Sequence, residues 1–252
     1  MDGHCIGIVG GLGPYAGLDL VKKIFDNTIA THDQDHLRVM LHSFPGDIPV
    51  RPEFLLGQSK VNPGHMLGQI MVGLSQAGAD LIAMPCNTAQ SPSILDMALE
   101  KLRSQNQKCK FIHIIETAVA EVKQMAVGKA RIGLMATVAT LQTRLYQDAL
   151  EKAGYQAVLL EEDECQAVQM AISHKEFGIK AGSNPVHPKA MEILLRAAEL
   201  LVNKGIDLLL LGCTEIPLAL TEKTYFGVST IDATNTLAKA LIRAYDPARL
   251  KD

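Results

Sequence analysis

The stretch GADLIAMPCNTA, residues 78–89, has a counterpart further along the chain in GIDLLLLGCTEI, residues 205–216. In both stretches a glycine and an aspartate precede an apolar run. A cysteine follows the run: Cys86 in the first stretch and Cys213, 127 residues later, in the second. A cysteine commonly serves as a small buried hydrophobe. That role alone does not predict the same residue at the same place after two separate strands, so the stretches indicate a duplicated strand–loop unit.

A second pair of stretches repeats at nearly the same separation. IGIVGGLGP, residues 6–14, and IGLMATVAT, residues 132–140, both begin with Ile-Gly, and their starts are 126 residues apart. Two strand–loop units therefore recur in the same order, which is the pattern of an internal duplication. We expect two similar lobes, each of which carries one of the two cysteines.

The expected domain bounds follow from this duplication. We place the first lobe, which carries Cys86, at residues 1–117, and the second lobe, which carries Cys213, at residues 118–227. Residues 228–252 are expected to form a C-terminal segment that returns to pack on the first lobe.

Short apolar runs alternate with amphipathic segments along the whole chain. The runs expected to be strands are residues 5–9, 38–43, 80–84, 110–115, 130–135, 157–160, 207–211 and 225–229. Most are continuously apolar, as in parallel strands covered on both faces. Helical stripes of apolar residues lie between them, at residues 67–74, 95–102, 141–150 and 193–201. The alternation predicts an α/β fold of two pseudo-symmetric lobes, each with a mainly parallel sheet flanked by helices. Ligands of such sheets bind beyond the carboxyl ends of the strands, so we expect the active site in a cleft between the lobes.

Composition excludes several classes of protein. The chain has 252 residues, of which 48% are apolar, and a formal net charge of −3, which argues against a nucleic-acid or polyanion surface. No apolar run approaches the length of a membrane span, and the start MDGHCIGIVGGLGP lacks the pattern of a signal peptide. The five cysteines form no CxxC pair, which disfavours a disulfide framework or a zinc knuckle. We therefore expect a cytoplasmic protein.

Two thiols that face one substrate suit a proton transfer at carbon. One thiol, as thiolate, removes a proton from a carbon, and the other returns a proton to the opposite face, so that the product is the mirror image. Cys86 lies just ahead of a helix expected to open at Ser91 and Pro92, whose positive end favours an anion. Side chains beside the two cysteines, namely those of Asn87, Thr88 and Thr214, supply donors for a substrate carboxylate. This chemistry predicts no redox cofactor, no pyridoxal phosphate and no metal.

Two further motifs resemble binding sites, but each also fits a turn or loop. GLGPYA, residues 11–16, fits a loose dinucleotide-binding pattern, but Pro14 occupies a position where that turn needs a free N–H. We instead expect a tight turn that presents the backbone of Gly11, Leu12 and Gly13 to the substrate. HDQDH, residues 32–36, resembles a metal-ligand cluster. No further ligand group accompanies it, and we expect a solvated loop.

The motifs PCNTA, GCTEIPL and GIVGGLGP together resemble those of the cofactor-independent aspartate/glutamate racemase superfamily, most closely its aspartate racemase branch. The resemblance runs from the first strand to about residue 220. It implies that Cys86 and Cys213 are the catalytic pair of a two-base racemase, commonly a homodimer. It also implies that Asn87, Thr88 and Thr214 bind the α-carboxylate.

Basic residues in two other segments match this superfamily. IPVR places Arg51, on a loop, where the superfamily binds the distal carboxylate of the substrate, and GIKAG places Lys180 in a charged stretch that would fold over the site. Thr137 and Glu215 complete the candidate substrate-binding set. The chain departs from the usual pattern at Gln90, where relatives carry histidine, and at Leu12, where they carry methionine. The Gln90 change removes a titratable group close to Cys86, whereas leucine for methionine conserves volume.

The leading hypothesis is an amino-acid racemase that interconverts L- and D-aspartate, or glutamate, with two cysteines. Two alternatives remain open: a related isomerase or decarboxylase of small dicarboxylic acids or a hydantoin racemase, and a non-catalytic amino-acid-binding protein. The sequence leaves open which acidic amino acid is the substrate and which thiol acts on which enantiomer.

Overall fold

The computed structural model describes residues 4–106 and 108–251 and separates into two compact units. The first unit contains the residues up to Ile114 together with those from Thr234 onward, and the second contains Ile115–Ala233. The chain therefore returns to the first unit at residue 234, and not at residue 228 as expected. The reason is that residues 228–232 form a strand that is hydrogen-bonded into the second sheet.

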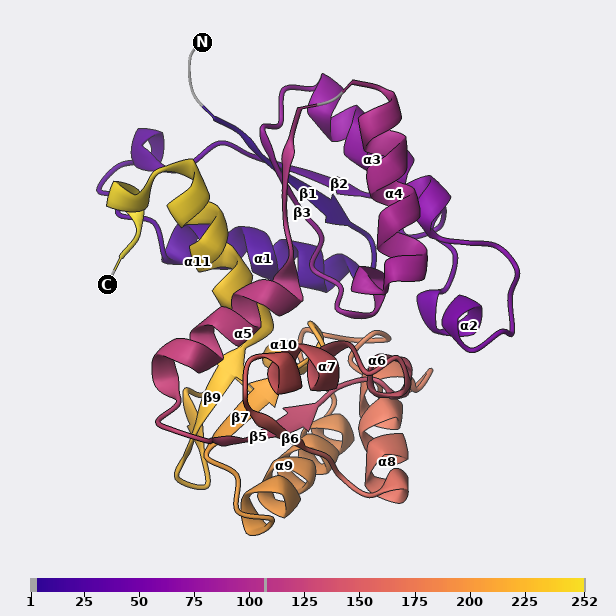
Figure 1. The fold of residues 1–252 in the computed structure, drawn as a ribbon, viewed down its shortest axis with the longest axis vertical. Helices are drawn as coiled ribbons and strands as arrows, with labels where there is room; N and C mark the ends of the chain where they lie inside the picture. The colour runs from indigo at the N-terminus through magenta and orange to yellow at the C-terminus, as the bar shows by residue number, and fades with distance from the viewer. Residues whose placement is uncertain (1–3, 107, 252) are drawn as a thin grey trace. The chain divides into compact units, whose positions relative to one another are not determined.

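The sheet of the first unit has four strands, all parallel (Figure 1). In spatial order they are β2 (Val39–Ser43), β1 (Ile6–Gly10), β3 (Leu81–Ala83) and β4 (Lys110–Ile112). Helix α1 (Pro14–Asp26) packs on β1 and β2, whereas α3 (Gly64–Gln76) packs on β1, β2 and β3 and lies against α4 (Pro92–Ser104). Right-handed crossovers in opposite directions from β1 and β2 place α1 on one face of the sheet and α3 on the other.

The remaining elements of the first unit are short or come from the end of the chain. They are α2 (Arg51–Leu55), the 3₁₀ turns Asp33–Asp35, Thr88–Gln90 and Pro247–Arg249, and α11 (Ala233–Tyr245), which begins at the last residue of the second unit. Hydrogen bonds tie the C-terminal segment to the residues that follow α1: Asn27 Nδ2 donates to Asn235 Oδ1 at 2.9 Å, and the Ile29 N–H donates to the Arg249 carbonyl at 2.7 Å.

The sheet of the second unit repeats this arrangement. In spatial order its strands are β6 (Gln156–Val158), β5 (Arg131–Met135), β7 (Leu208–Leu211), β9 (Val228–Asp232) and β8 (Thr224–Tyr225). All pairs are parallel except β8 with β9. The prediction of one strand over residues 225–229 is wrong, because Phe226 and Gly227 have φ of 50° and 82° and form the tight turn of a hairpin.

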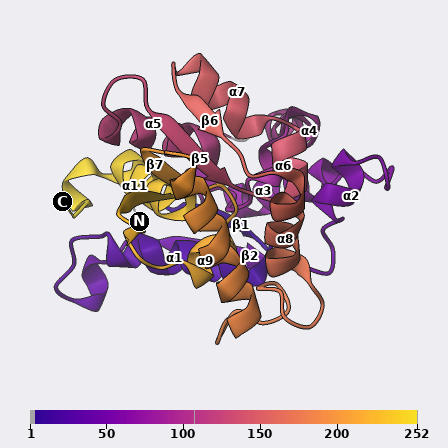
Figure 2. The same ribbon diagram turned by 90° about the horizontal axis from the view of Figure 1, so that it is seen from below.

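Helices cover the second sheet as well. They are α5 (Ile114–Met125), α6 (Val138–Gln142), α7 (Leu145–Lys152), α8 (Glu162–Ser173), α9 (Pro188–Asn203) and the short α10 (Ile216–Ala219). Figures 1 and 2 both show α8 and α9 side by side, with α9 against β5 and β7. The single helix expected around residues 141–150 is instead α6 followed by α7, because Arg144 adopts a left-handed conformation, with φ of 53°, between them.

The internal repeat is present in the hydrogen bonding of both units. Ile6 pairs with Leu81 in the first sheet, and Ile132 pairs with Leu208 in the second. At the start of each strand pair an aspartate side chain accepts a hydrogen bond from the neighbouring backbone: Asp80 from the Cys5 N–H at 2.9 Å, and Asp207 from the Arg131 N–H at 2.7 Å. The aspartates singled out in the sequence thus fix the pairing of the central strands.

The glycines of the repeated Ile-Gly pair permit close packing under each sheet. A Cβ at Gly7 would lie 2.9 Å from the Ala79 Cβ and 3.2 Å from the Leu74 Cβ. A Cβ at Gly133 would lie 2.5 Å from the Ile206 Cδ1. The atoms that crowd Gly7 are fixed to the backbone, whereas Ile206 Cδ1 is the end of a side chain that can rotate.

We therefore expect Gly7→Ala to lower the free energy of unfolding by about 1–3 kcal/mol, the usual cost of overpacking a core, and Gly133→Ala to lower it less. Urea unfolding measures both. Gly46→Ala is the matched control, because a Cβ at Gly46 would meet no atom within 4 Å. A Gly7→Ala variant as stable as the control would contradict this packing.

Candidate functional site

Two strand-end loops of the first unit carry most of its predicted site residues. Gly11, Leu12 and Gly13 follow β1, and Cys86 lies in the loop that follows β3. Because β1 and β3 are adjacent and parallel, both loops leave the same edge of the sheet. Gly11 has φ of 86°, and a Cβ there would lie 2.9 Å from the Pro45 nitrogen, so this turn requires glycine.

Cys86 is a buried thiol in a rigidly held loop. Its residue is 6% exposed, and its backbone N–H donates to the Met84 carbonyl at 2.8 Å. Gln90, 2% exposed, donates from Nε2 to the carbonyls of Cys86 at 3.1 Å and Met84 at 3.3 Å. Gln90 therefore holds the backbone on both sides of the thiol. The neighbouring side chains of Asn87 and Thr88 are also buried.

Arg51 is buried and lies in a short helix, and not on a loop as expected. It is the first residue of α2, which forms there because Pro52 suits the first turn of a helix. The residue is 8% exposed, and its Nη2 donates to the Leu12 carbonyl at 2.8 Å. This bond brings a cation to the glycine-rich turn that follows β1.

The second unit presents an equivalent pair of strand ends. Thr137 follows β5 and caps α6, where its Oγ1 accepts a hydrogen bond from the Thr140 N–H at 3.3 Å. Cys213, Thr214 and Glu215 follow β7, which pairs in parallel with β5. These predicted residues therefore also share one edge of a sheet.

Cys213 is paired with a buried carboxylate. Its residue is 6% exposed, and its Sγ donates a hydrogen bond to Glu215 Oε2 at 3.1 Å. Burial raises the pKa of the Cys213 thiol well above its usual range, and the Glu215 charge raises it further, while the Lys180 ammonium opposes both. Cys213 is therefore a thiol at neutral pH.

Lys180 lies beside the same carboxylate. Its Nζ is 3.6 Å from Glu215 Oε1. The segment before it is anchored, since Ile179 is fully buried and the N–H groups of Ile179 and Lys180 donate to the carbonyls of Ala171 and Ile172. Ile179 belongs to the hydrophobic core of the second unit, so the segment is anchored directly before Lys180, and a role of Lys180 at the site stays a prediction.

Sequence reasoning missed Tyr146. This fully buried residue of α7 packs its ring against Gly212, where a Cβ would lie 3.0 Å from the Tyr146 Cε2. Burial raises the pKa of the Tyr146 hydroxyl, and the nearby Cys213 and Asp232 raise it further. An aromatic residue in an amphipathic helix has the pattern of a core residue, so only the fold reveals this proximity.

Other features of the described residues lie apart from these loops. Residues 32–36 form an exposed turn in which His32 and Asp35 cap one another. Within residues 4–106 and 108–251, no group of three or more His, Cys, Asp or Glu side chains is placed to hold a metal ion, and no helix is long and apolar enough to cross a membrane.

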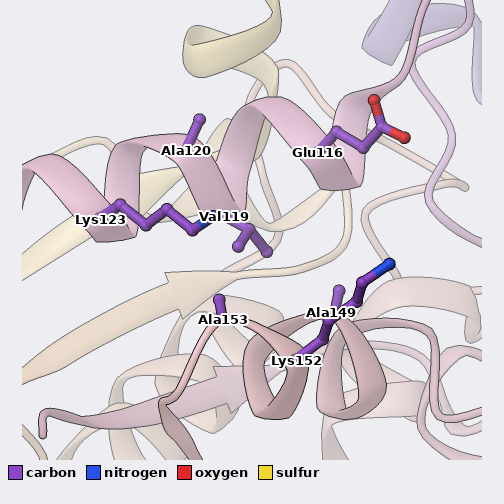
Figure 3. Close-up of a pocket in the computed structure, with 7 residues that line it drawn as sticks. All are labelled: Glu116, Val119, Ala120, Lys123, Ala149, Lys152 and Ala153. Atoms are coloured by element: carbon purple, nitrogen blue, oxygen red, sulfur yellow. The ribbon is translucent and has the colours of Figure 1, made fainter.

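A cavity of about 370 Å³ lies between α5 and α7 (Figure 3). It is lined by Glu116, Val119, Ala120, Lys123, Ala149, Lys152 and Ala153, none of which is a predicted site residue.

Comparison with known proteins gives the family of the chain. Residues 9–241 match the profile of the family described as Asp/Glu/Hydantoin racemase. The aspartate racemase of Picrophilus torridus has the same fold, with a TM-score of 0.80 and 26% identity, over 99% of this chain and 96% of that chain.

Two curated relatives extend the comparison. The broad specificity amino-acid racemase RacX of Bacillus subtilis is 25% identical over 244 residues, which are 95% of this chain and 97% of that protein. The glutamate racemase of Aquifex aeolicus is 33% identical over 171 residues, which are 67% of this chain but only 59% of that protein. The chain therefore belongs to the Asp/Glu/Hydantoin racemase family.

Proposed function

We propose that the protein is a racemase of acidic amino acids, with aspartate as the first candidate substrate and glutamate as the second, and that Cys86 and Cys213 are its two bases. One observation carries the proposal. Each unit presents one buried thiol at the end of the equivalent central strand, β3 in the first and β7 in the second. The family to which the chain belongs consists of racemases that work without pyridoxal phosphate.

The reaction needs two proton transfers at the α-carbon. A thiolate takes the α-proton: the C–H bond breaks, an S–H bond forms, and the electron pair moves onto the substrate α-carboxylate. The S–H bond of the other thiol then breaks, and its proton forms a new C–H bond on the opposite face. Atoms and charge balance within the two thiols and the substrate, so the chain needs neither pyridoxal phosphate nor a metal for this chemistry.

Donors close to the two cysteines suit the α-carboxylate. Asn87 and Thr88 follow Cys86 directly, Thr214 follows Cys213, and all three are buried. Negative charge builds on the α-carboxylate as the proton leaves, so donors held in a buried site stabilise the transition state more than the ground state. We assign the same role to Thr137 and to the backbone of Gly11, Leu12 and Gly13.

The preference for an acidic side chain rests on Arg51. A buried guanidinium that already donates to the Leu12 carbonyl has further N–H groups for a second, distal carboxylate. Lys180 is the second candidate cation. Relatives described as aspartate racemase and glutamate racemase agree with this class of substrate. We also propose that the protein is a homodimer. Analytical sedimentation would measure this oligomeric state.

A screen of substrates tests the function directly. We expect the purified protein, without added cofactor, to racemise aspartate or glutamate faster than any other proteinogenic amino acid, as measured by chiral chromatography. Maleate, aryl-malonates and hydantoins belong in the same screen, because turnover of one of these alone would assign the chain to another activity. Tight binding of an amino acid without any optical change would indicate a binding protein.

Replacement of either thiol tests the mechanism. We expect Cys86→Ser and Cys213→Ser each to lower the rate of racemisation by about 10²–10⁴-fold, the usual contribution of a general acid or base. Cys109→Ser is the matched control, because the partly buried Cys109 thiol packs against the core of the first unit and donates to the Ala79 carbonyl at 3.0 Å. Full racemase activity of Cys86→Ser or of Cys213→Ser would contradict the two-base mechanism.

Replacement of Arg51 tests substrate selection. We expect Arg51→Gln to lower kcat/KM for aspartate by about 10–100-fold, since a hydrogen bond to a charged group contributes about 1.5–3 kcal/mol, and to affect alanine much less. Arg103→Gln, on the exposed face of α4, is the control. An equal loss with both substrates would show that Arg51 only supports the fold.

A further inference from the structure

Cys86 and Cys213 differ in the charged groups that lie next to their thiols. The Cys213 thiol donates to Glu215 Oε2 at 3.1 Å, and Glu215 is only 4% exposed. Cys86 has no carboxylate partner of this kind within its own unit in the part of the chain that the structure describes, and the nearby Gln90 is a neutral amide. Among the described residues of their own units, the Cys213 thiol is therefore paired with a buried carboxylate and the Cys86 thiol is not.

The neighbours of Glu215 hold its side chain beside Cys213. Lys180 Nζ lies 3.6 Å from Oε1, so a cation accompanies the buried carboxylate. Thr214 Oγ1 donates to Oε2 at 3.4 Å, the same oxygen that accepts from Cys213. A carboxylate held in this way would repel an acidic substrate, which argues against the substrate-binding role that the sequence assigned to Glu215.

Another titratable group, Tyr146, is close to Cys213. Tyr146 is fully buried and stays neutral, because burial raises the pKa of its hydroxyl. The nearby Asp232 also raises the pKa of the Tyr146 hydroxyl. The Glu215 charge raises the pKa of the Cys213 thiol more than the Lys180 ammonium lowers it, and a hydrogen bond from the Glu215 backbone also lowers it. The net charge around Cys213 therefore favours the protonated thiol.

We propose that Glu215 is a positioning residue that holds the proton on Cys213, so that Cys213 enters the reaction as the acid and Cys86 as the base. This rests on the two-thiol function proposed above. The Cys86 thiolate takes the α-proton and becomes a thiol, and the Cys213 S–H bond breaks to form the new C–H bond. One negative charge moves from Cys86 to Cys213, where it faces the Glu215 carboxylate. Two like charges on adjacent buried atoms are unfavourable, so after product release Cys213 takes a proton from solvent water and Cys86 releases the α-proton to solvent water, which restores the starting state.

Alkylation of the thiols tests this assignment without any need for activity. Iodoacetamide reacts with thiolates, and peptide mass spectrometry gives the pH of half-reaction for each cysteine. In the unmodified protein we expect Cys213 to react at a higher pH than Cys86. Glu215→Gln removes the negative charge beside Cys213 and should lower its midpoint by about one pH unit or more, a tenfold change in ionisation, without moving that of Cys86. Glu161→Gln, which removes an exposed carboxylate of the same unit, should move neither.

Exchange of the α-proton in deuterated water separates this inference from the function on which it rests. In Cys213→Ser only Cys86 can remove a proton, and in Cys86→Ser only Cys213 can. We expect exchange by Cys86→Ser to need a higher pH than exchange by Cys213→Ser, and the addition of Glu215→Gln to Cys86→Ser to lower that pH.

The outcomes of these experiments distinguish the two-thiol function from the proposed role of Glu215. If neither single variant exchanges either enantiomer, the two-thiol function is wrong, and the role of Glu215 fails with it. If both exchange but Glu215→Gln leaves the titration of Cys213 unchanged, only the role of Glu215 is overturned. If Glu215→Gln does not fold, alkylation of the unmodified protein still tests the inference. Reaction of Cys213 at a lower pH than Cys86 would contradict the assignment of Cys213 as the acid.

Discussion

In each unit, the two central strands are parallel and hydrogen-bonded in the same register, so their carboxyl ends reach one edge of the sheet together. The aspartates Asp80 and Asp207 fix this register by accepting a backbone hydrogen bond from the neighbouring strand. A shift by one residue would turn the buried face of such a strand outward. The positions of Cys86 and Cys213 depend on this pairing, because each cysteine lies a few residues beyond the strand that it follows.

Duplication gives the two units similar strand ends but different chemistry around their thiols. In the first unit, the Gln90 amide donates to the backbone on both sides of Cys86 and adds no charge. In the second, the Glu215 carboxylate accepts a hydrogen bond from Cys213 itself, and Lys180 accompanies it. A racemase needs one thiol that is ionised and one that is protonated, and this difference in charge is a physical means to assign the two states.

Most of the architecture was predictable, because buried parallel strands and amphipathic helices leave strong patterns in a sequence. The predicted helices and strands were wrong where one or two residues have a positive φ angle. Arg144 divides an expected helix, and Phe226 with Gly227 divides an expected strand. Arg51 was expected on a loop, but it begins α2 and donates to the Leu12 carbonyl, 39 residues away in sequence. Such long-range contacts leave no local pattern.

The sequence by itself determined the α/β class, the duplicated strand–loop unit and the family, since repeated residues after apolar strands survive as a linear pattern. Only the tertiary structure decided that Glu215 faces Cys213, that Tyr146 packs beside the same loop, and that Gln90 holds the backbone around Cys86. Partners of this kind depend on the direction of side chains and on burial. Both arise when the chain folds, and neither can be read from the order of its residues.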